Sequence, residues 1–189
     1  QRFLGKTTVV CKDTPAFIAN RIGVYSIMSL FHTVTEMGLT VEEVDKLTGL
    51  AMGRPKSATF RTCDVVGLDT LVHVANGVKD NCPNDEANAI FTIPSYITKM
   101  VENKWLGSKT EQGFFKKVKG AGGKSDIHVL DLKTLEYKPS EKVKFATLEA
   151  TKTIDNLRAR MKVLLAGKDK AGDFYRESFY SLFSYVSNR

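Results

Sequence analysis

The chain of 189 residues is long enough for one ordinary domain, or for one domain and part of another. Hydrophobic residues make up 42% and charged residues 26%, which is typical of a soluble globular protein, and no apolar run approaches the ~20 residues of a membrane-spanning helix. The net charge of +7 is spread along the chain beside acidic residues, which argues against nucleic-acid binding and is compatible with an anionic small substrate.

The cysteines favour a reducing environment. Cys11, Cys63 and Cys82 are odd in number and have no Cys-x-x-Cys spacing. No secretory segment opens the chain. We therefore predict a cytoplasmic location and treat the cysteines as core residues.

The first predicted elements are a short strand and a long helix. Residues 6–12 are rich in β-branched side chains, which predicts a strand. A helix over 15–37 follows, with Asp13 or Thr14 as its cap and Pro15 in its first position. Its apolar residues are too dense for a thin stripe, so we expect a central helix packed on several faces.

Local signals divide the next part of the chain. Gly38 is expected to end the long helix, and Thr40 with Glu43 has the spacing of a capping box for a second helix, which reaches about residue 51. A third helical pattern begins near Ala58. It is interrupted at Gly67, where the chain can bend.

The remaining elements are mostly helical. Residues 79–93 read as a loop, and another helix starts at Pro94 or Ser95. The glycine-rich segment 120–125 lacks the frame of a phosphate-binding loop. Residues 127–138 alternate around a polar turn and predict a β-hairpin, after which helical spacing returns to the end of the chain. The predicted fold class is therefore mainly α, with one short hairpin.

Asn20 is the residue that most needs a chemical explanation. It lies in the first two turns of an otherwise apolar helix, and its carboxamide offers two donors and one acceptor. On the residues alone, a role in chemistry and a role as a locally satisfied polar group stay equally open. Arg21 is expected to be a structural ion-pair partner.

No full active site can be built from the spacing of other residues. The spacing of the residues indicates no Ser/His/Asp triad, no pair of catalytic carboxylates and no metal-binding site. The histidines lie far apart and are interpreted as packed or surface residues. They are His32, His73 and His128.

A series of motifs occurs in order along the first 118 residues. They are Lys12-Asp13-Thr14-Pro15-Ala16-Phe17 with Asn20-Arg21, then Glu43-Val44-Asp45, then Gly53-Arg54-Pro55 through Phe60 to Asp64-Val65-Val66-Gly67-Leu68-Asp69-Thr70, and last Leu106-Gly107-Ser108-Lys109-Thr110 with Gly113-Phe114-Phe115. Together they resemble the C-terminal domain of the 3-hydroxyacyl-CoA dehydrogenases over about residues 5–118. Ala16 stands where this family usually has glycine, and we expect an alanine there to adopt ordinary helical torsion angles.

The resemblance implies a domain organisation. NAD and a catalytic His–Glu pair would belong to an N-terminal Rossmann domain outside this chain, and residues 1–14 would be the tail end of that domain and a linker. Residues 15–118 would form the helical C-terminal domain, which makes a homodimer and closes over the acyl-CoA substrate. Residues 119–189 fit less well and are interpreted as a hairpin plus a helical extension, compatible with the start of a degenerate second helical copy in a long bacterial fusion with an enoyl-CoA hydratase.

The resemblance also implies a function. The asparagine matching Asn20 projects into the family's cleft, near the substrate oxygen and the catalytic histidine. We predict the substrate-binding and dimerisation part of an NAD-dependent (S)-3-hydroxyacyl-CoA dehydrogenase of fatty-acid β-oxidation, inactive as this chain alone, with a dimer face near residues 66–71. Two alternatives stay open: a non-catalytic helical dimerisation module, and the C-terminal domain of a related dehydrogenase acting on smaller hydroxy acids.

Overall fold

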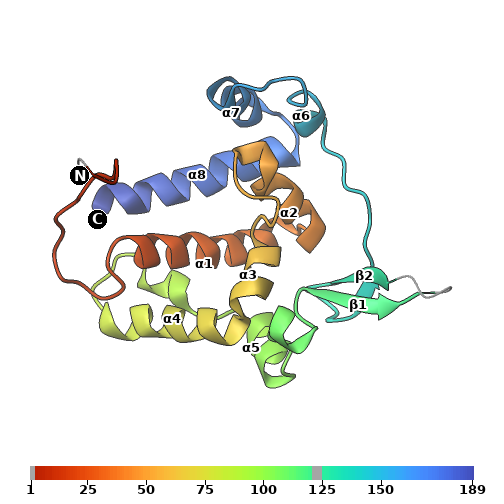
Figure 1. The fold of residues 1–189 in the computed structure, drawn as a ribbon, viewed down its shortest axis with the longest axis horizontal. Coiled ribbons are helices and arrows are strands. Elements are labelled where there is room, and N and C mark those ends of the chain that lie inside the picture. The colour runs from red at the N-terminus through yellow and green to blue at the C-terminus, as the bar shows by residue number, and fades with distance from the viewer. Residues whose placement is uncertain (1–2, 121–124) are drawn as a thin grey trace.

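The computed structural model describes residues 3–120 and 125–189, and helices dominate it, which confirms the predicted mainly α fold (Figure 1). The helices are α1 (Ala19–Met37), α2 (Val41–Thr48), α3 (Phe60–Val66), α4 (Leu68–Asn81), α5 (Ser95–Glu102), α6 (Ala146–Glu149), α7 (Leu157–Ala166) and α8 (Lys170–Asn188). The strands are β1 (Phe115–Lys119), β2 (Ser125–Leu130) and β3 (Tyr137–Pro139), and 3₁₀ turns occur at η1 (Leu50–Met52), η2 (Asn88–Phe91) and η3 (Ser108–Thr110). Among the described residues, every helix is too short or too polar for a membrane crossing.

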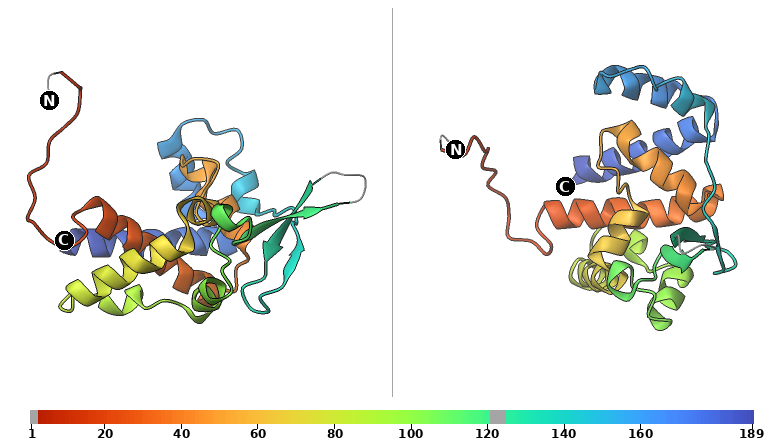
Figure 2. Two further views of the ribbon diagram at one scale, coloured as in Figure 1. Left: turned by 60° about the horizontal axis from the view of Figure 1, so that its bottom comes forward. Right: turned by 45° about the vertical axis from the view of Figure 1, so that its right-hand side comes forward.

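Helix α1 is the central element. It lies between α8 on one side and α4 on the other, while α2 and α3 lie near its C-terminal half (Figures 1 and 2). Its buried residues are Val24, Tyr25, Met28, Leu30, Phe31, Thr33 and Val34, which occupy more than one face. The predicted central helix packed on several faces is confirmed.

An aromatic cluster joins α1 to the elements that follow it. The ring of Phe60 lies 5.7 Å from that of Phe31 and 4.4 Å from that of Phe114, measured between centroids. All three side chains are fully buried. Such pairs each contribute about 0.5–1.5 kcal/mol beyond the area they bury. The cluster therefore fixes α3 and the turn before β1 against the central helix.

The predicted helix signals at Gly38, Thr40 and Gly67 are confirmed. Gly38 ends α1 in the left-handed conformation, with φ of 59°, and its N–H bonds to the last turn of the helix. The side chain of Thr40 accepts from the N–H of Glu43 at 3.2 Å, and the side chain of Glu43 accepts from the N–H of Thr40 at 2.8 Å. Gly67, with φ of 96°, separates α3 from α4.

The sheet contains one strand more than predicted. β2 and β3 form the expected antiparallel hairpin, with Leu130 opposite Tyr137. β1 pairs with the other edge of β2, with Phe115 opposite Val129, and the sequence does not predict it because its lysines break the apolar alternation. The glycine-rich segment 120–125 lies largely outside the described residues.

The strand predicted over residues 6–12 is wrong. This segment is exposed and unpaired in the structure, and the exposed fraction of Val10 is 96%. A β segment needs a neighbour to satisfy its backbone groups, and none of the described strands lies beside it. A high β propensity alone is therefore not enough to make this segment a strand.

The C-terminal residues return to the central helix. A segment without regular structure leads from β3 to the short helix α6, and α7 and α8 follow. The carboxylate of Asp169 caps α8 through the N–H of Gly172 and also binds Thr147, next to the start of α6. α8 then runs beside α1 (Figure 2). The comparison of residues 119–189 with a second helical copy stays a prediction.

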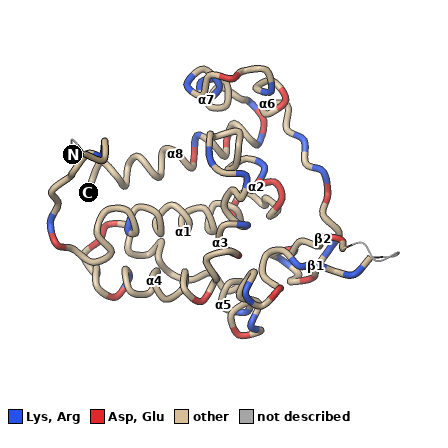
Figure 3. Tube along the Cα trace, in the orientation of Figure 1, with Lys and Arg blue, Asp and Glu red and all other residues tan. Residues whose placement is uncertain are grey.

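Charged residues avoid the middle of the central helix. Lys and Arg are distributed over many elements, with Asp and Glu among them (Figure 3). Helix α1 carries no charged residue between Arg21 and Glu36. Arg21 is therefore the only Lys or Arg side chain of α1, at the end of the helix where the chain enters it.

Candidate functional site at the start of helix α1

Asn20 lies in the first turn of α1, and its side chain is exposed. The helix begins at Ala19, later than predicted, so Asn20 is its second residue. Within the described part of the chain, the carboxamide of Asn20 makes no hydrogen bond. Its donors and its acceptor therefore remain available to a group outside these residues.

The chain enters α1 through two left-handed residues. Ala16 has φ of 62° and Phe17 has φ of 51°. The N–H of Phe17 bonds to the carbonyl of Thr14 at 3.0 Å, which makes a turn rather than a first helical turn. The expectation of ordinary helical torsion angles at Ala16 is wrong. The glycine usual in the resembled family suits this conformation, since a left-handed residue with a Cβ costs roughly 1–2 kcal/mol.

The predicted cap of α1 is also wrong. The capping position is Ile18, and no side chain accepts a hydrogen bond from the first turn. Pro15 precedes the left-handed pair and so does not occupy the first helical position. The free N–H groups of this turn therefore receive no local side-chain acceptor.

Arg21 is held by two residues from distant elements, and we call these three residues the Arg21 clamp. Its guanidinium pairs with the fully buried carboxylate of Asp85, in the loop between α4 and η2. Nε of Arg21 donates to the hydroxyl of Tyr185 on α8 at 3.0 Å, and that hydroxyl donates to Oδ2 of Asp85 at 2.8 Å. The ion-pair role expected for Arg21 is confirmed, whereas its partners could not be identified from the sequence.

The electrostatics of the clamp favour the charged pair. Burial acts to raise the pKa of Asp85, but the hydrogen bonds from Arg21, from the N–H of Ala87 and from Tyr185 outweigh it, so the pKa lies below its usual value. Burial raises the pKa of Tyr185 to about 12. Tyr185 is therefore a neutral donor near neutral pH, and Asp85 is an anion.

Asp45, from the second motif, has a structural role. Its Oδ1 accepts from the N–H groups of Thr59 at 3.1 Å and Phe60 at 2.6 Å, and its Oδ2 accepts from that of Arg61 at 3.0 Å. These donors lie at the start of α3, where a helix leaves N–H groups unsatisfied. Asp45 thus caps α3 from α2.

Asp64 connects α3 to the last motif. Its buried carboxylate accepts from the N–H groups of Phe114 at 2.8 Å and Phe115 at 2.9 Å. A Cβ at Gly113 would overlap this carboxylate, and one at Gly107 would overlap the Asp64 backbone. These two glycines are needed for close packing, so this motif also serves the architecture.

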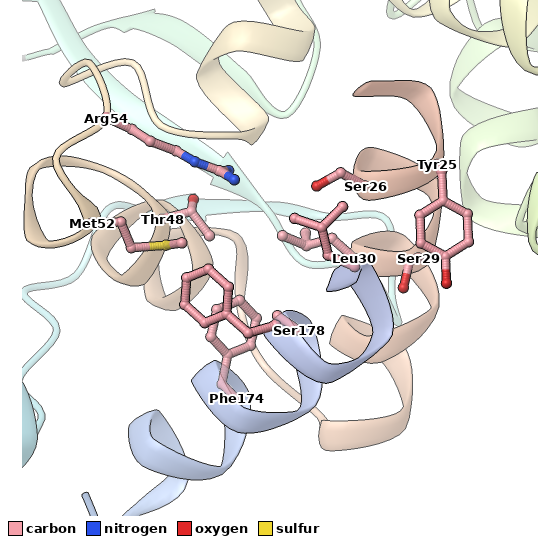
Figure 4. Close-up of a pocket in the computed structure, with 11 residues that line it drawn as sticks. Tyr25, Ser26, Ser29, Leu30, Thr48, Met52, Arg54, Phe174 and Ser178 are labelled. Carbon is pink, nitrogen blue, oxygen red and sulfur yellow. The ribbon is translucent and has the colours of Figure 1, made fainter. Parts of the chain in front are cut away.

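A pocket lies between α1 and α8. Ser26 and Ser29 of α1 lie opposite Phe174 and Ser178 of α8, with Arg54 on another side (Figure 4). These serines lie further along α1 than Asn20, by roughly 9–14 Å at 1.5 Å per residue. The pocket is thus separate from the exposed carboxamide, and nothing in its geometry assigns it a ligand.

The histidines and cysteines do not gather at the site. Nε2 of His32 lies 3.1 Å from the carbonyl oxygen of Ile90, which ties α1 to η2. Cys63 and Cys82 are buried, which confirms the predicted core role for these two, whereas Cys11 is exposed, so the prediction is wrong for it; none of the three forms a disulfide. Within residues 3–120 and 125–189, no three His, Cys, Asp or Glu side chains are arranged to hold a metal ion.

Comparisons with known proteins point to one family. The family described as 3-hydroxyacyl-CoA dehydrogenase, C-terminal domain, matches residues 17–117. A probable 3-hydroxyacyl-CoA dehydrogenase of Bacillus subtilis (strain 168) is 48% identical over 172 residues, which are 91% of this chain and 21% of the relative. A putative fatty acid oxidation complex trifunctional enzyme of Rickettsia prowazekii (strain Madrid E) is 27% identical over 188 residues, which are 99% of this chain and 24% of the relative.

A solved structure supports the same assignment. The crystal structure of M. tuberculosis FadB2 matches with a TM-score of 0.50 and 32% sequence identity, covering 60% of this chain and 38% of that chain. This chain spans only 21% of the Bacillus relative and 24% of the Rickettsia one. The family match covers more than half of the chain and contains Asn20, the Asp45 cap and the Asp64 connection. The chain therefore belongs to the 3-hydroxyacyl-CoA dehydrogenase family, as its C-terminal domain.

Proposed function

We propose that this chain is the substrate-binding and dimerisation part of an NAD-dependent (S)-3-hydroxyacyl-CoA dehydrogenase in fatty-acid β-oxidation. The membership in the family supports the reaction class. The name of the Rickettsia relative, a fatty acid oxidation complex enzyme, supports the process. The unpaired cysteines fit a reducing compartment, which supports a cytoplasmic location.

The observation that carries the proposal is that the carboxamide of Asn20 is free to bind a substrate. Its carboxamide is exposed and has no hydrogen-bond partner among the described residues, yet Arg21, the next residue, is anchored in the protein. In this proposal, the amide N–H of Asn20 donates to the oxygen on C3 of the acyl-CoA. A fixed donor at that oxygen orients C3 and stabilises the negative charge that develops there.

The described residues of this chain do not fit a dinucleotide site. A Rossmann site needs a parallel strand, a glycine-rich turn and a helix N-terminus at the pyrophosphate. The described sheet is antiparallel throughout and has no such unit. In this proposal, NAD therefore binds to another part of the longer protein.

Replacing Asn20 in the full-length enzyme tests the proposal. Asn20→Ala should lower kcat by about 10²-fold, as expected for loss of one positioned donor. Asn20→Asp keeps the shape but removes the N–H donor, so it should also lose activity. Asn76→Ala, at an exposed position on α4, is the control. A kcat for Asn20→Ala within twofold of the control would favour the non-catalytic dimerisation module.

A homodimer is the second part of the proposal. The predicted face at residues 66–71 needs one correction, because Leu68 and Leu71 are buried in the core of the chain. Val65 and Val66 are 66% and 53% exposed at the end of α3. These two valines are the apolar surface that we propose for self-association.

A further inference from the structure

We propose that Asp85 and Tyr185 are positioning residues for Asn20, because they hold Arg21 and through it the first turn of α1. The inference rests on the proposed role of Asn20. Neither residue is recognisable from the sequence as part of a site. Tyr185 also lies beyond residues 17–117, the part of the chain that the family covers.

The first turn of α1 needs an external anchor. It follows two left-handed residues, Ala16 and Phe17, and it has no side-chain cap. The segment before it is exposed and unpaired, and the side chain of Phe17 is 62% exposed. Local contacts therefore do little to fix the direction in which this turn points.

The Arg21 clamp provides that anchor. Each of its three side chains contacts the other two, so none can move independently. Asp85 is held further by the N–H of Ala87, which donates to its Oδ1 at 2.9 Å. The guanidinium presents several donors in a fixed plane, so two acceptors in different directions define its orientation.

A second contact keeps α8 in register with α1. The ring of Tyr185 stacks on that of Tyr25, with centroids 3.8 Å apart and an angle of 6° between the planes. Tyr25 lies four residues after Arg21, on the neighbouring turn of the same helix face. Tyr185 therefore touches α1 at two successive turns and restrains both its rotation and its position.

The direction of Asn20 follows from these restraints. Neighbouring residues of a helix are separated by a fixed rotation, so a fixed Arg21 also fixes where the Cβ of Asn20 points. Errors of about 1 Å in a reacting group can cost ~10²-fold in rate. The C-terminal helix α8 thus takes part in the geometry of a site to which it contributes no reacting group.

Removal of one hydroxyl tests this inference in the full-length enzyme. Tyr185→Phe keeps the stacked ring but loses the two hydrogen bonds that the hydroxyl makes to Arg21 and Asp85, and we expect kcat to fall about tenfold with KM within twofold. The control is Tyr175→Phe, which removes a buried hydroxyl from the same helix, α8, where it donates to the carbonyl of Leu47 at 2.8 Å. It should lower the melting temperature to a similar extent but leave kcat within twofold.

A double mutant separates positioning from general destabilisation. If Tyr185 acts through Asn20, then Tyr185→Phe should have no further effect on kcat in the Asn20→Ala enzyme. Full additivity of the two losses would overturn the inference, as would equal kcat values for Tyr185→Phe and Tyr175→Phe. Asp85→Asn removes the anion that pairs with Arg21 and leaves one acceptor oxygen, so it should reproduce the selective loss of kcat if Tyr185→Phe folds poorly. No effect of Asn20→Ala alone would instead refute the proposed function, and this inference with it.

Discussion

Replacement of Asp64 by alanine would test how strongly the last motif depends on this carboxylate. Asp64 is 1% exposed, and its carboxylate accepts hydrogen bonds from two backbone N–H groups at 2.8 and 2.9 Å. A bond to a charged group contributes about 1.5–3 kcal/mol, and alanine would leave both donors unsatisfied. We therefore expect Asp64→Ala to lower the free energy of unfolding by about 3–5 kcal/mol at pH 7.

The pH dependence gives a second measure of the same contact. Burial raises the pKa of Asp64 to about 6, although its two N–H bonds act to lower it. The pKa of an unfolded aspartate is about 3.9, so between these values the folded chain binds a proton that the unfolded chain has lost. The free energy of unfolding must then fall as pH rises through this window. Asp64→Ala should therefore reduce the dependence of the unfolding free energy on pH. Burial also raises the pKa of Asp45 to about 6, so Asp45 should keep part of this dependence in the variant.

Urea unfolding followed by circular dichroism at pH 5 and pH 7 would measure both effects. Asp155→Ala removes an exposed carboxylate and serves as the control. The difference between wild type and Asp64→Ala should be larger at pH 5 than at pH 7. A loss below 1 kcal/mol at pH 7, or a difference that grows with pH, would refute this reasoning.

Two further changes address the start of α1 and the proposed dimer. Ala16→Gly should raise the free energy of unfolding by about 0.5–1 kcal/mol, because glycine relieves the left-handed strain but loses more chain entropy. Thermal unfolding measures this, and a lower melting temperature would contradict the left-handed conformation. Val66→Asp should shift the full-length enzyme from dimer toward monomer in light scattering, since it places a charge in an apolar face. A wild type that is monomeric at high concentration, or an unaffected dimer, would exclude this face.

Elements with signals close together in the sequence could be predicted. Thr40 and Glu43 are three residues apart, and the turn geometry at Gly38 and Gly67 depends on the glycines themselves. In each case the deciding interaction lies within a single turn of the chain. The central position of α1 also follows from its own composition, because a helix that is apolar on several sides needs neighbours on all of them.

Features that depend on distant partners could not be predicted. The strand expected over residues 6–12 lacks a neighbour, and β1 becomes a strand because β2 provides one. At the candidate site, the resemblance to the family identifies Asn20 as a site residue, and the charge of Arg21 identifies it as an ion-pair partner. Nothing near Asp85 or Tyr185 in the sequence indicates that they meet Arg21. Left-handed torsion at Ala16 could not be predicted because the residue itself disfavours it.

The Arg21 clamp also has a consequence for the order in which the protein is assembled. Arg21 and Tyr185 are separated by 164 positions along the chain. At a synthesis rate of ~5–20 residues per second, Tyr185 follows Arg21 after roughly 8–30 s. Helix α1 therefore emerges from the ribosome before α8, and the contact that fixes its first turn forms only when α8 has been made. Asn20, the residue proposed to contact substrate, therefore reaches its final geometry only after synthesis has passed Tyr185.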